Sequence, residues 1–168
     1  GAYFTRGTSS DTYASYFERG PEYIYNMERL LRKFETDKAL AKQAIVRRAA
    51  QRTKYGALYF GSTAPVMSEA IDVLEESHLY VDTLRIRAFP FADSIAEFIA
   101  AHEHVFVVEQ NRDAQLRSLL VNECNVAPAR LTPVLHYDGT PITARFVVRE
   151  IAANRAAFNI PPARRVAP

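Results

Sequence analysis

The stretch Val105-Phe106-Val107-Val108-Glu109-Gln110-Asn111 places four apolar residues directly before three polar ones. Four consecutive apolar residues are typical of a strand covered on both faces, as in the middle of a parallel sheet. Ligands of open α/β sheets bind outside the carboxyl ends of such strands, where Glu109, Gln110 and Asn111 would lie. A helix is expected to begin nearby, after Arg112, and its first N–H groups would suit an anion or a partner. The alternative is that the three polar residues only end the strand and start a turn.

Strands and helices alternate on both sides of this stretch. We expect four strands, at 55–60, 79–89, 104–109 and 131–137. We expect the intervening helices at 66–77, after a possible N-cap at Asp93, at 114–124, and from the turn at 138–141 to about 157. Strands joined through helices pair in parallel, with the helices packed on the sheet. The sequence therefore predicts an α/β fold with a mostly parallel sheet of four or five strands, helices on both faces, and a helical arm before it.

The arm is predicted from Pro21, which suits the first turn of a helix. Apolar residues then recur at helical spacing and form one stripe, which we expect to be an inner face: Tyr23, Ile24, Met27, Leu30, Leu31 and Phe34. The pattern is weaker from Asp37 to Gln51, where Ala44-Ile45-Val46 is alternatively a short edge strand. We divide the chain into a linker and amphipathic helical arm at 1–54, an α/β domain at 55–160 and a flexible, Pro-rich tail at 161–168.

The composition is that of an ordinary globular protein. The chain has 168 residues, of which 48% are hydrophobic and 24% charged, enough for one domain with a real core. No apolar run is long enough to cross a bilayer, and the start lacks the apolar region of a signal peptide. The single cysteine, Cys124, fits a reducing compartment. We expect a cytoplasmic protein with no membrane partner.

Charge is distributed unevenly. Basic residues predominate from Arg29 to Lys54, and acidic residues predominate from Pro65 to Glu123. Clustered Lys and Arg neutralise phosphates, but the stretch from Lys38 to Lys54 lacks interleaved aromatic residues and no nucleic-acid module surrounds it. We therefore expect a solvated helix face or a contact with an acidic protein surface rather than a nucleic-acid site.

Catalytic signatures are missing from the sequence. Gly61-Ser62-Thr63 lacks the further glycines of a phosphate-binding loop, and there is no Gly-x-Ser-x-Gly motif. His102-Glu103-His104 lacks a third histidine or cysteine for zinc, and Cys124 fits a core thiol better than a nucleophile. Glu109 would be a general acid or base only with a partner that the sequence does not identify. We predict no catalytic, cofactor-binding or metal-binding residue in this chain.

One group of residues does share a position. Because the carboxyl ends of parallel strands meet at one edge of a sheet, residues after the four strands should lie together there. This edge is either a ligand crevice or a docking face, and Tyr137-Asp138-Gly139 within it is alternatively an ordinary turn. The candidate edge residues are Ser62, Thr63, Phe89, Phe91, Glu109, Gln110, Asn111 and Asp138.

Several motifs occur in an order that resembles a known family. They are Tyr3-Phe4-Thr5-Arg6-Gly7-Thr8, Asn26-Met27-Glu28-Arg29-Leu30-Leu31-Arg32-Lys33, Tyr59-Phe60-Gly61-Ser62-Thr63, Arg87-Ala88-Phe89-Pro90-Phe91, Val107-Val108-Glu109-Gln110-Asn111, Gln115-Leu116 and Tyr137-Asp138-Gly139. Together they resemble the C-terminal part of the alpha subunit of 2-oxoacid:ferredoxin oxidoreductases, nearest to the 2-oxoglutarate type and related to the pyruvate type. One departure is Ala114, where the family often has glycine before Gln-Leu.

The resemblance implies a transketolase C-terminal-like domain in an enzyme that oxidatively decarboxylates a 2-oxoacid to an acyl-CoA and reduces ferredoxin. It implies thiamine diphosphate, magnesium and an iron–sulfur cluster in the full enzyme, none of them held by this chain. In the family, the diphosphate and magnesium are held by the beta subunit and the pyrimidine side lies in an earlier alpha-subunit domain, and one cysteine cannot ligate a cluster. The implied partners are upstream alpha-subunit domains and a thiamine-binding beta subunit in a dimeric assembly. We expect an assembly domain that is inactive alone. The alternative is a freestanding α/β module that binds a small anion at the strand carboxyl edge.

Overall fold

The computed structural model describes residues 10–11 and 13–154 and divides into two compact units, Gly1–Ala41 and Lys42–Pro168. The first unit contains helix α1 (Gly20–Leu40), and the second contains the sheet and the remaining helices. The motif at 3–8 and the tail predicted at 161–168 lie outside the described residues.

The second unit is built on one five-stranded sheet with the order β1-β3-β2-β4-β5. Its strands are β1 (Ile45–Arg47), β2 (Tyr55–Phe60), β3 (Asp82–Ile86), β4 (His104–Glu109) and β5 (Leu131–Leu135). β1 pairs antiparallel with β3, and the other pairs are parallel. β5 forms the far edge and contains Pro133, which has no N–H to donate. The predicted mostly parallel sheet is confirmed.

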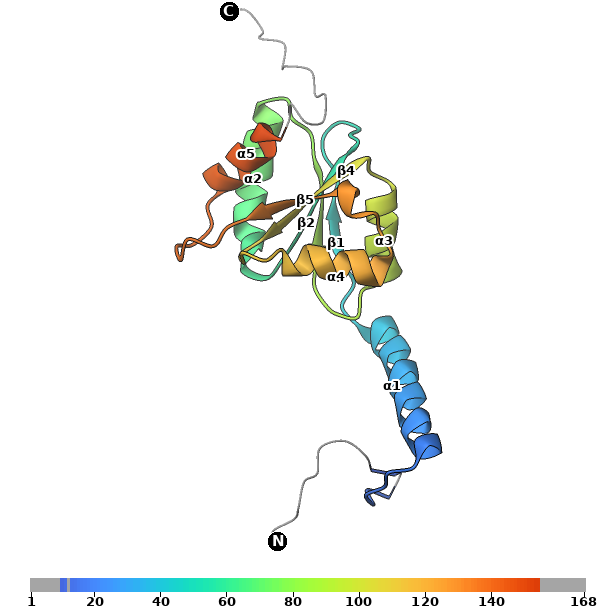
Figure 1. The fold of residues 1–168 in the computed structure, drawn as a ribbon. Helices are drawn as coiled ribbons and strands as arrows, with labels where there is room; N and C mark the ends of the chain where they lie inside the picture. Colours follow the sequence, from blue (N-terminus) through green and yellow to red (C-terminus); the bar gives the residue numbers. More distant parts are fainter. Residues whose placement is uncertain (1–9, 12, 155–168) are drawn as a thin grey trace, which may run out of the picture. The chain divides into compact units, whose positions relative to one another are not determined.

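Helices cover both faces of the sheet, as predicted (Figure 1). α2 (Ala64–Glu76) and α5 (Ala144–Ala153) pack on one face, and α3 (Asp93–Ala100) and α4 (Gln115–Cys124) pack on the other. Two short 3-10 helices, η1 (Gly61–Thr63) and η2 (Pro128–Arg130), complete the unit.

The position of the interior strand β4 explains why four consecutive residues, Val105 to Val108, are apolar. Val105 and Val107 belong to the core under α3 and α4, whereas Phe106 and Val108 belong to the core under α2 and α5. All four side chains are at most 1% exposed. Successive strand residues point to opposite faces, so a strand between two helical layers needs an apolar residue at each position.

The region before β2 differs from its prediction. The apolar stripe of α1 was expected to be an inner face, but no α1 residue is buried, and Ile24 and Leu31 are 58% and 66% exposed. The alternative of an edge strand around Ala44-Ile45-Val46 is correct, since β1 joins the sheet there. The sheet therefore begins before residue 55, where the sequence placed the start of the α/β domain.

Helix boundaries also differ slightly from prediction. Asp93 is the first residue of α3 and not its N-cap, because the extended residue before the helix is Ala92. An acidic residue in the first turn still interacts favourably with the helix dipole. Among the helices of the described ranges, none is both long and apolar enough to cross a membrane.

Candidate functional site

The candidate site lies at the carboxyl edge of the sheet, where β2 and β4 are neighbours although β3 separates them in sequence. The chain leaves β2 toward β3 on one side, and leaves β4 toward β5 on the other. This is a topological switch point, the place where open α/β sheets usually bind ligands. The residues that follow β2 and β4 therefore determine whether this edge can bind a ligand or a partner.

Glu109 ends β4, but its side chain is fully buried and turns toward helix α4. Its two carboxylate oxygens accept hydrogen bonds from the backbone N–H groups of Leu116, at 2.7 Å, and Arg117, at 3.1 Å. The Asn111 amide donates a third bond to this carboxylate at 2.6 Å. A carboxylate at this position satisfies orphan N–H groups and opposes the positive end of the helix dipole. Glu109 lies at the predicted edge but acts there as a helix cap.

The other N–H groups that open α4 are also engaged. Asn111 Oδ1 accepts from the Gln115 N–H at 3.2 Å and from the Asp113 N–H at 3.1 Å. The Ser118 N–H donates to the carbonyl of Ala114 at 2.9 Å. The anion seat predicted at this helix start is therefore filled by the chain's own Glu109 and Asn111. A second anion there would face a buried carboxylate.

Gln110 joins the two sides of the switch point. Its amide nitrogen lies 3.2 Å from Ser62 Oγ and 3.1 Å from Thr63 Oγ1, both in the turn after β2. Thr63 is buried and Ser62 is exposed. The structure thus brings together five of the predicted edge residues, and their hydrogen bonds hold the loops in place.

Beside these loops is a cavity of about 470 Å³, at the edge that the sequence left as either a ligand crevice or a docking face. Two of the predicted edge residues, Phe89 and Phe91, lie in its wall with their rings edge to face at 5.2 Å. The remaining lining comes from the ends of β2 and β3 and from α4: Phe60, Gly61, Ile86, Arg87, Ala88, Asn111, Gln115, Leu116 and Leu119. Two features of the sequence could have indicated this cavity: the Arg87–Phe91 motif after the strand, and the spacing of Gln115 and Leu119, which places both on one face of a helix.

Asp138 is not joined to these residues by any hydrogen bond or ion pair of the described chain. Its Oδ1 accepts from the hydroxyl and the N–H of Thr140, at 2.7 and 2.8 Å. The bond from the Thr140 hydroxyl is the larger cause and the bond from its N–H the next, and together they hold the pKa of the exposed Asp138 carboxyl below its usual range. His136 Nε2 lies 3.4 Å from the same oxygen. This is the arrangement of an ordinary Asx turn, the alternative that the sequence left open.

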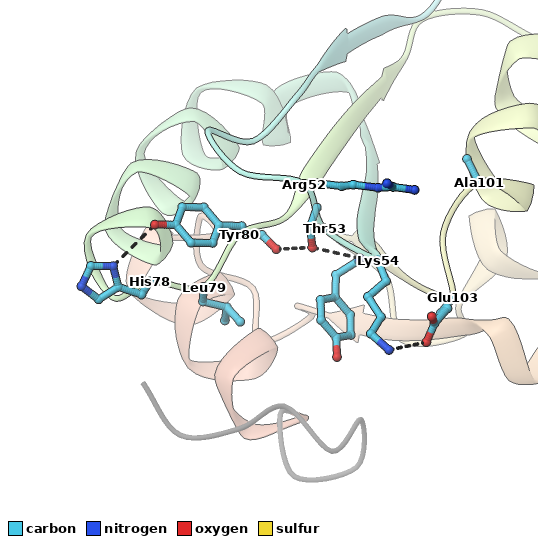
Figure 2. A pocket seen from close by; sticks show the side chains of 9 residues that line it. Arg52, Thr53, Lys54, His78, Leu79, Tyr80, Ala101 and Glu103 are labelled. Atoms are coloured by element: carbon cyan, nitrogen blue, oxygen red, sulfur yellow. Dashed lines mark hydrogen bonds and ion pairs between the residues drawn. The ribbon is translucent and has the colours of Figure 1, made fainter. Parts of the chain in front are cut away.

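A second cavity, of about 520 Å³, lies at the opposite edge of the sheet, beside the start of β2 (Figure 2). Lys54 and Glu103 form an exposed ion pair at 2.9 Å in its wall, which raises the pKa of Lys54. The Thr53 hydroxyl donates to the Tyr80 carbonyl at 2.7 Å. Exposed pairs of this kind contribute little to binding or stability.

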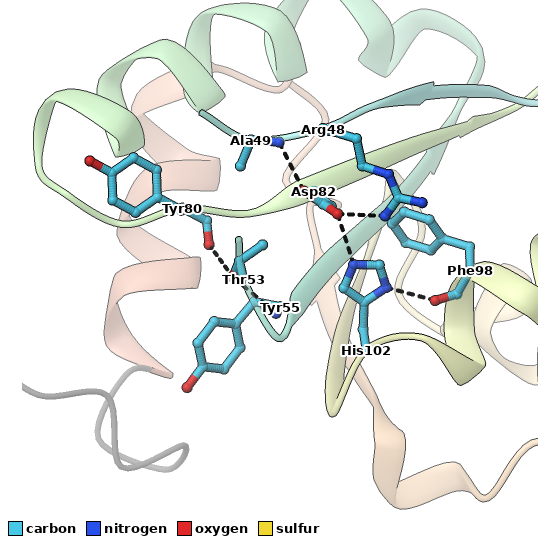
Figure 3. A network of polar contacts seen from close by, with 8 residues as sticks. All are labelled: Arg48, Ala49, Thr53, Tyr55, Tyr80, Asp82, Phe98 and His102. Carbon is cyan, nitrogen blue, oxygen red and sulfur yellow. Dashed lines mark hydrogen bonds and ion pairs between the residues drawn. The ribbon is translucent and has the colours of Figure 1, made fainter. Parts of the chain in front are cut away.

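A partly buried network fixes the segment between β1 and β2 to the sheet (Figure 3). The Asp82 carboxylate accepts from Arg48 Nη1 at 2.6 Å and from the Ala49 N–H at 2.8 Å, and it lies 3.2 Å from His102 Nε2. Burial by itself raises the pKa of Asp82, but the bonds from Ala49, Arg48 and His102 outweigh it and hold the pKa below its usual range. His102 Nδ1 lies 2.6 Å from the Phe98 carbonyl, so both of its ring nitrogens face acceptors.

These contacts also separate the three residues of His102-Glu103-His104. His102 is 2% exposed and faces Asp82, Glu103 pairs with Lys54, and His104 stacks on Tyr55 at 6.0 Å. Within residues 10–11 and 13–154, no group of three His, Cys, Asp or Glu side chains could hold a metal ion.

Comparison with known proteins gives a match in structure only. No family model and no curated protein matches this sequence. The structure matches a 2-oxoglutarate:ferredoxin oxidoreductase from Magnetococcus marinus, solved with 2-oxoglutarate, coenzyme A and succinyl-CoA bound, with a TM-score of 0.77 and 19% identity. That match covers 90% of this chain and 26% of the other, so this chain spans about a quarter of its length.

A second solved structure is the alpha chain of a probable 2-oxoacid ferredoxin oxidoreductase from Thermoplasma acidophilum. It has 18% identity and a TM-score of 0.44, and the match covers 66% of this chain and 95% of the other. The fold assignment depends on the first structure alone. This chain therefore has the fold found in one quarter of a 2-oxoglutarate:ferredoxin oxidoreductase chain, in the group of enzymes that its sequence motifs resemble.

Proposed function

We propose that this chain is the C-terminal, transketolase-like domain of the alpha subunit of a 2-oxoacid:ferredoxin oxidoreductase, and that its role is assembly. The observation that carries the proposal is the fold match over 90% of this chain to part of a longer 2-oxoglutarate:ferredoxin oxidoreductase chain. The ordered motifs of the sequence point to the same enzymes. The parent enzyme would convert a 2-oxoacid to an acyl-CoA and reduce ferredoxin in the cytoplasm.

The chemistry of the described residues supports an assembly role. At the switch point, Glu109, Gln110 and Asn111 are engaged in bonds that cap α4 and connect two loops. Cys124 is the one cysteine of the chain, whereas an iron–sulfur cluster needs several thiolates. A cluster would therefore be held elsewhere in the enzyme. By the resemblance, thiamine diphosphate and magnesium would be held by other domains and by a beta subunit, and this domain alone would be inactive.

Helix α1 supplies a surface for such a neighbour. Residues 42–168 make up about three quarters of the chain, so a match over 90% must include part of residues 1–41. The apolar stripe on α1 is exposed, with Ile24, Leu31 and Phe34 at 58%, 66% and 49%. Exposed apolar patches of this kind mark protein contacts. We expect the stripe to pack on the preceding alpha-subunit domain or on the beta subunit.

The test is a pull-down of the tagged chain from its native cell extract, followed by mass spectrometry. We expect to recover a thiamine-dependent beta subunit or a longer alpha chain. The double variant Ile24→Ser with Leu31→Ser should reduce that recovery about tenfold, because it removes apolar contact area. The matched control changes Glu28 and Lys33 of the same helix to Ser and should leave recovery unchanged.

Two results would argue against the proposal. One is recovery of the folded chain, checked by circular dichroism, without either subunit. The other is release of CO2 from 2-oxoglutarate by the isolated chain when thiamine diphosphate, Mg²⁺ and coenzyme A are added. The first of these would favour the alternative of a freestanding binding module.

A further inference from the structure

We propose that the cavity beside Phe60 and Phe89 binds a small amphipathic carboxylate, with the apolar part of the ligand inside and its carboxylate on Arg87. The inference does not depend on the assembly role. It depends on the lining of the cavity, on one cation at its rim that has no ion pair within the described part of the chain, and on the occupied N-terminus of α4.

The cavity has the size and lining of a small-molecule site. Its volume of about 470 Å³ lies in the range of ligand pockets, roughly 300–1,000 Å³. Ile86, Phe91 and Leu116 form a buried floor and are 6%, 9% and 8% exposed. Phe60 and Phe89 in the wall are 43% and 51% exposed. An apolar ligand would cover these two rings, which gives the favourable term for binding.

The charge at the rim selects the ligand. Arg87 is the one charged side chain among the described residues that line the cavity, and it forms no hydrogen bond or ion pair with any described residue. The Asn111 amide is already bonded to Glu109 and to two backbone N–H groups. The Gln115 side chain, also exposed, is the second polar group left at the rim. A guanidinium beside an apolar cavity binds a planar carboxylate through two parallel hydrogen bonds.

The start of α4 offers no competing position for the carboxylate. Its N–H groups are engaged by Glu109, Asn111 and Ala114, and the buried Glu109 carboxylate would repel a second anion. The ligand's charge is therefore expected at Arg87 and not at the helix terminus.

The experiment titrates the chain with three probes, 4-phenylbutyrate, its neutral amide and butyrate, followed by calorimetry and by ¹H–¹⁵N NMR. We expect saturable binding of 4-phenylbutyrate, with shifts at Phe60, Phe89 and Leu119. The amide should bind about tenfold more weakly because it lacks the charge-assisted bonds. Butyrate should show no saturation over the same range because it buries too little apolar surface.

Variants separate the charge from the cavity. Arg87→Gln should weaken 4-phenylbutyrate about tenfold and leave the amide unchanged, whereas Phe89→Ala should weaken both. The matched control is Arg52→Gln, an exposed arginine of the other cavity, which should change neither. Both arginines are exposed, so a thermal melt is expected to show folded variants. Equal binding of acid and amide, equal effects of the two arginine variants, or shifts scattered over the surface would overturn the proposal.

Discussion

Replacing Glu109 with Gln tests whether this buried carboxylate caps α4. The amide keeps the size of the side chain but has one oxygen. If that oxygen keeps the bonds from Leu116 and Asn111, the new NH2 group faces the Arg117 N–H. Two donors then face each other in place of the 3.1 Å hydrogen bond from the Arg117 N–H to Glu109. A buried N–H left unsatisfied costs about 1–3 kcal/mol. Loss of the negative charge at the helix start costs about 0.3–2 kcal/mol more.

We therefore expect Glu109→Gln to lower the free energy of unfolding by about 3 kcal/mol, or the melting temperature by about 6–12 °C for a chain of this size. Urea denaturation followed by circular dichroism measures the change in the free energy of unfolding. The matched control is Glu123→Gln, which removes the same charge from an exposed position near the other end of α4. A negative charge near the C-terminus of a helix interacts unfavourably with the helix dipole, so removing it should be neutral or slightly stabilising. A loss below about 0.5 kcal/mol in Glu109→Gln, or equal effects in both variants, would refute the capping role.

Three further changes are expected to alter stability, each measured by the same denaturation. Gly56→Ala should cost about 1–2 kcal/mol, because the added Cβ would lie 2.7 Å from Cε1 of the buried Phe98 ring; an unchanged midpoint would contradict this. Ala114→Gly should stabilise by up to about 1 kcal/mol, since Ala114 has φ 50° and ψ 48°, and a destabilised variant would show that the left-handed backbone costs nothing. Asp82→Asn should cost about 2 kcal/mol near pH 6. Because the bonds from Ala49, Arg48 and His102 lower the pKa of Asp82 in the folded state, this contribution is present above pH 3.8, the ordinary value. It is lost as the pH falls from that value through the lowered folded pKa; an effect that is the same at pH 6 and pH 3 would contradict stabilisation through the ionised carboxylate.

Features encoded by local pattern could be predicted from the sequence. The apolar run Val105–Val108 identified an interior strand, because burial on both faces leaves that signature without any knowledge of the neighbours. The direction of Glu109 was also available. It has the same parity as Val105 and Val107, which face α3 and α4, so alternation along the strand directs its carboxylate toward α4.

Features that depend on contacts between distant residues could not be predicted. The bonds of Asp82 join residues that are 20 to 34 positions apart, and no spacing rule covers them. The cavity at Arg87 depends on how far the loop after β3 lies from α4, which is a property of the assembled sheet. The prediction that the apolar stripe of α1 is an inner face was wrong for the same reason. An amphipathic pattern indicates that a face will be covered, but not that this chain covers it.

The two outer strands restrict how this protein can join others. β1 has three residues, and β5 contains Pro133, so neither side of the sheet presents a long, regular row of N–H and C=O groups. Short strands and proline at an edge are the usual protection against strand addition and fibrous growth. Sheet extension from one copy into the next is therefore disfavoured. If the chain joins others, we expect side chains on its helices and loops to make the contacts, and not an exposed strand.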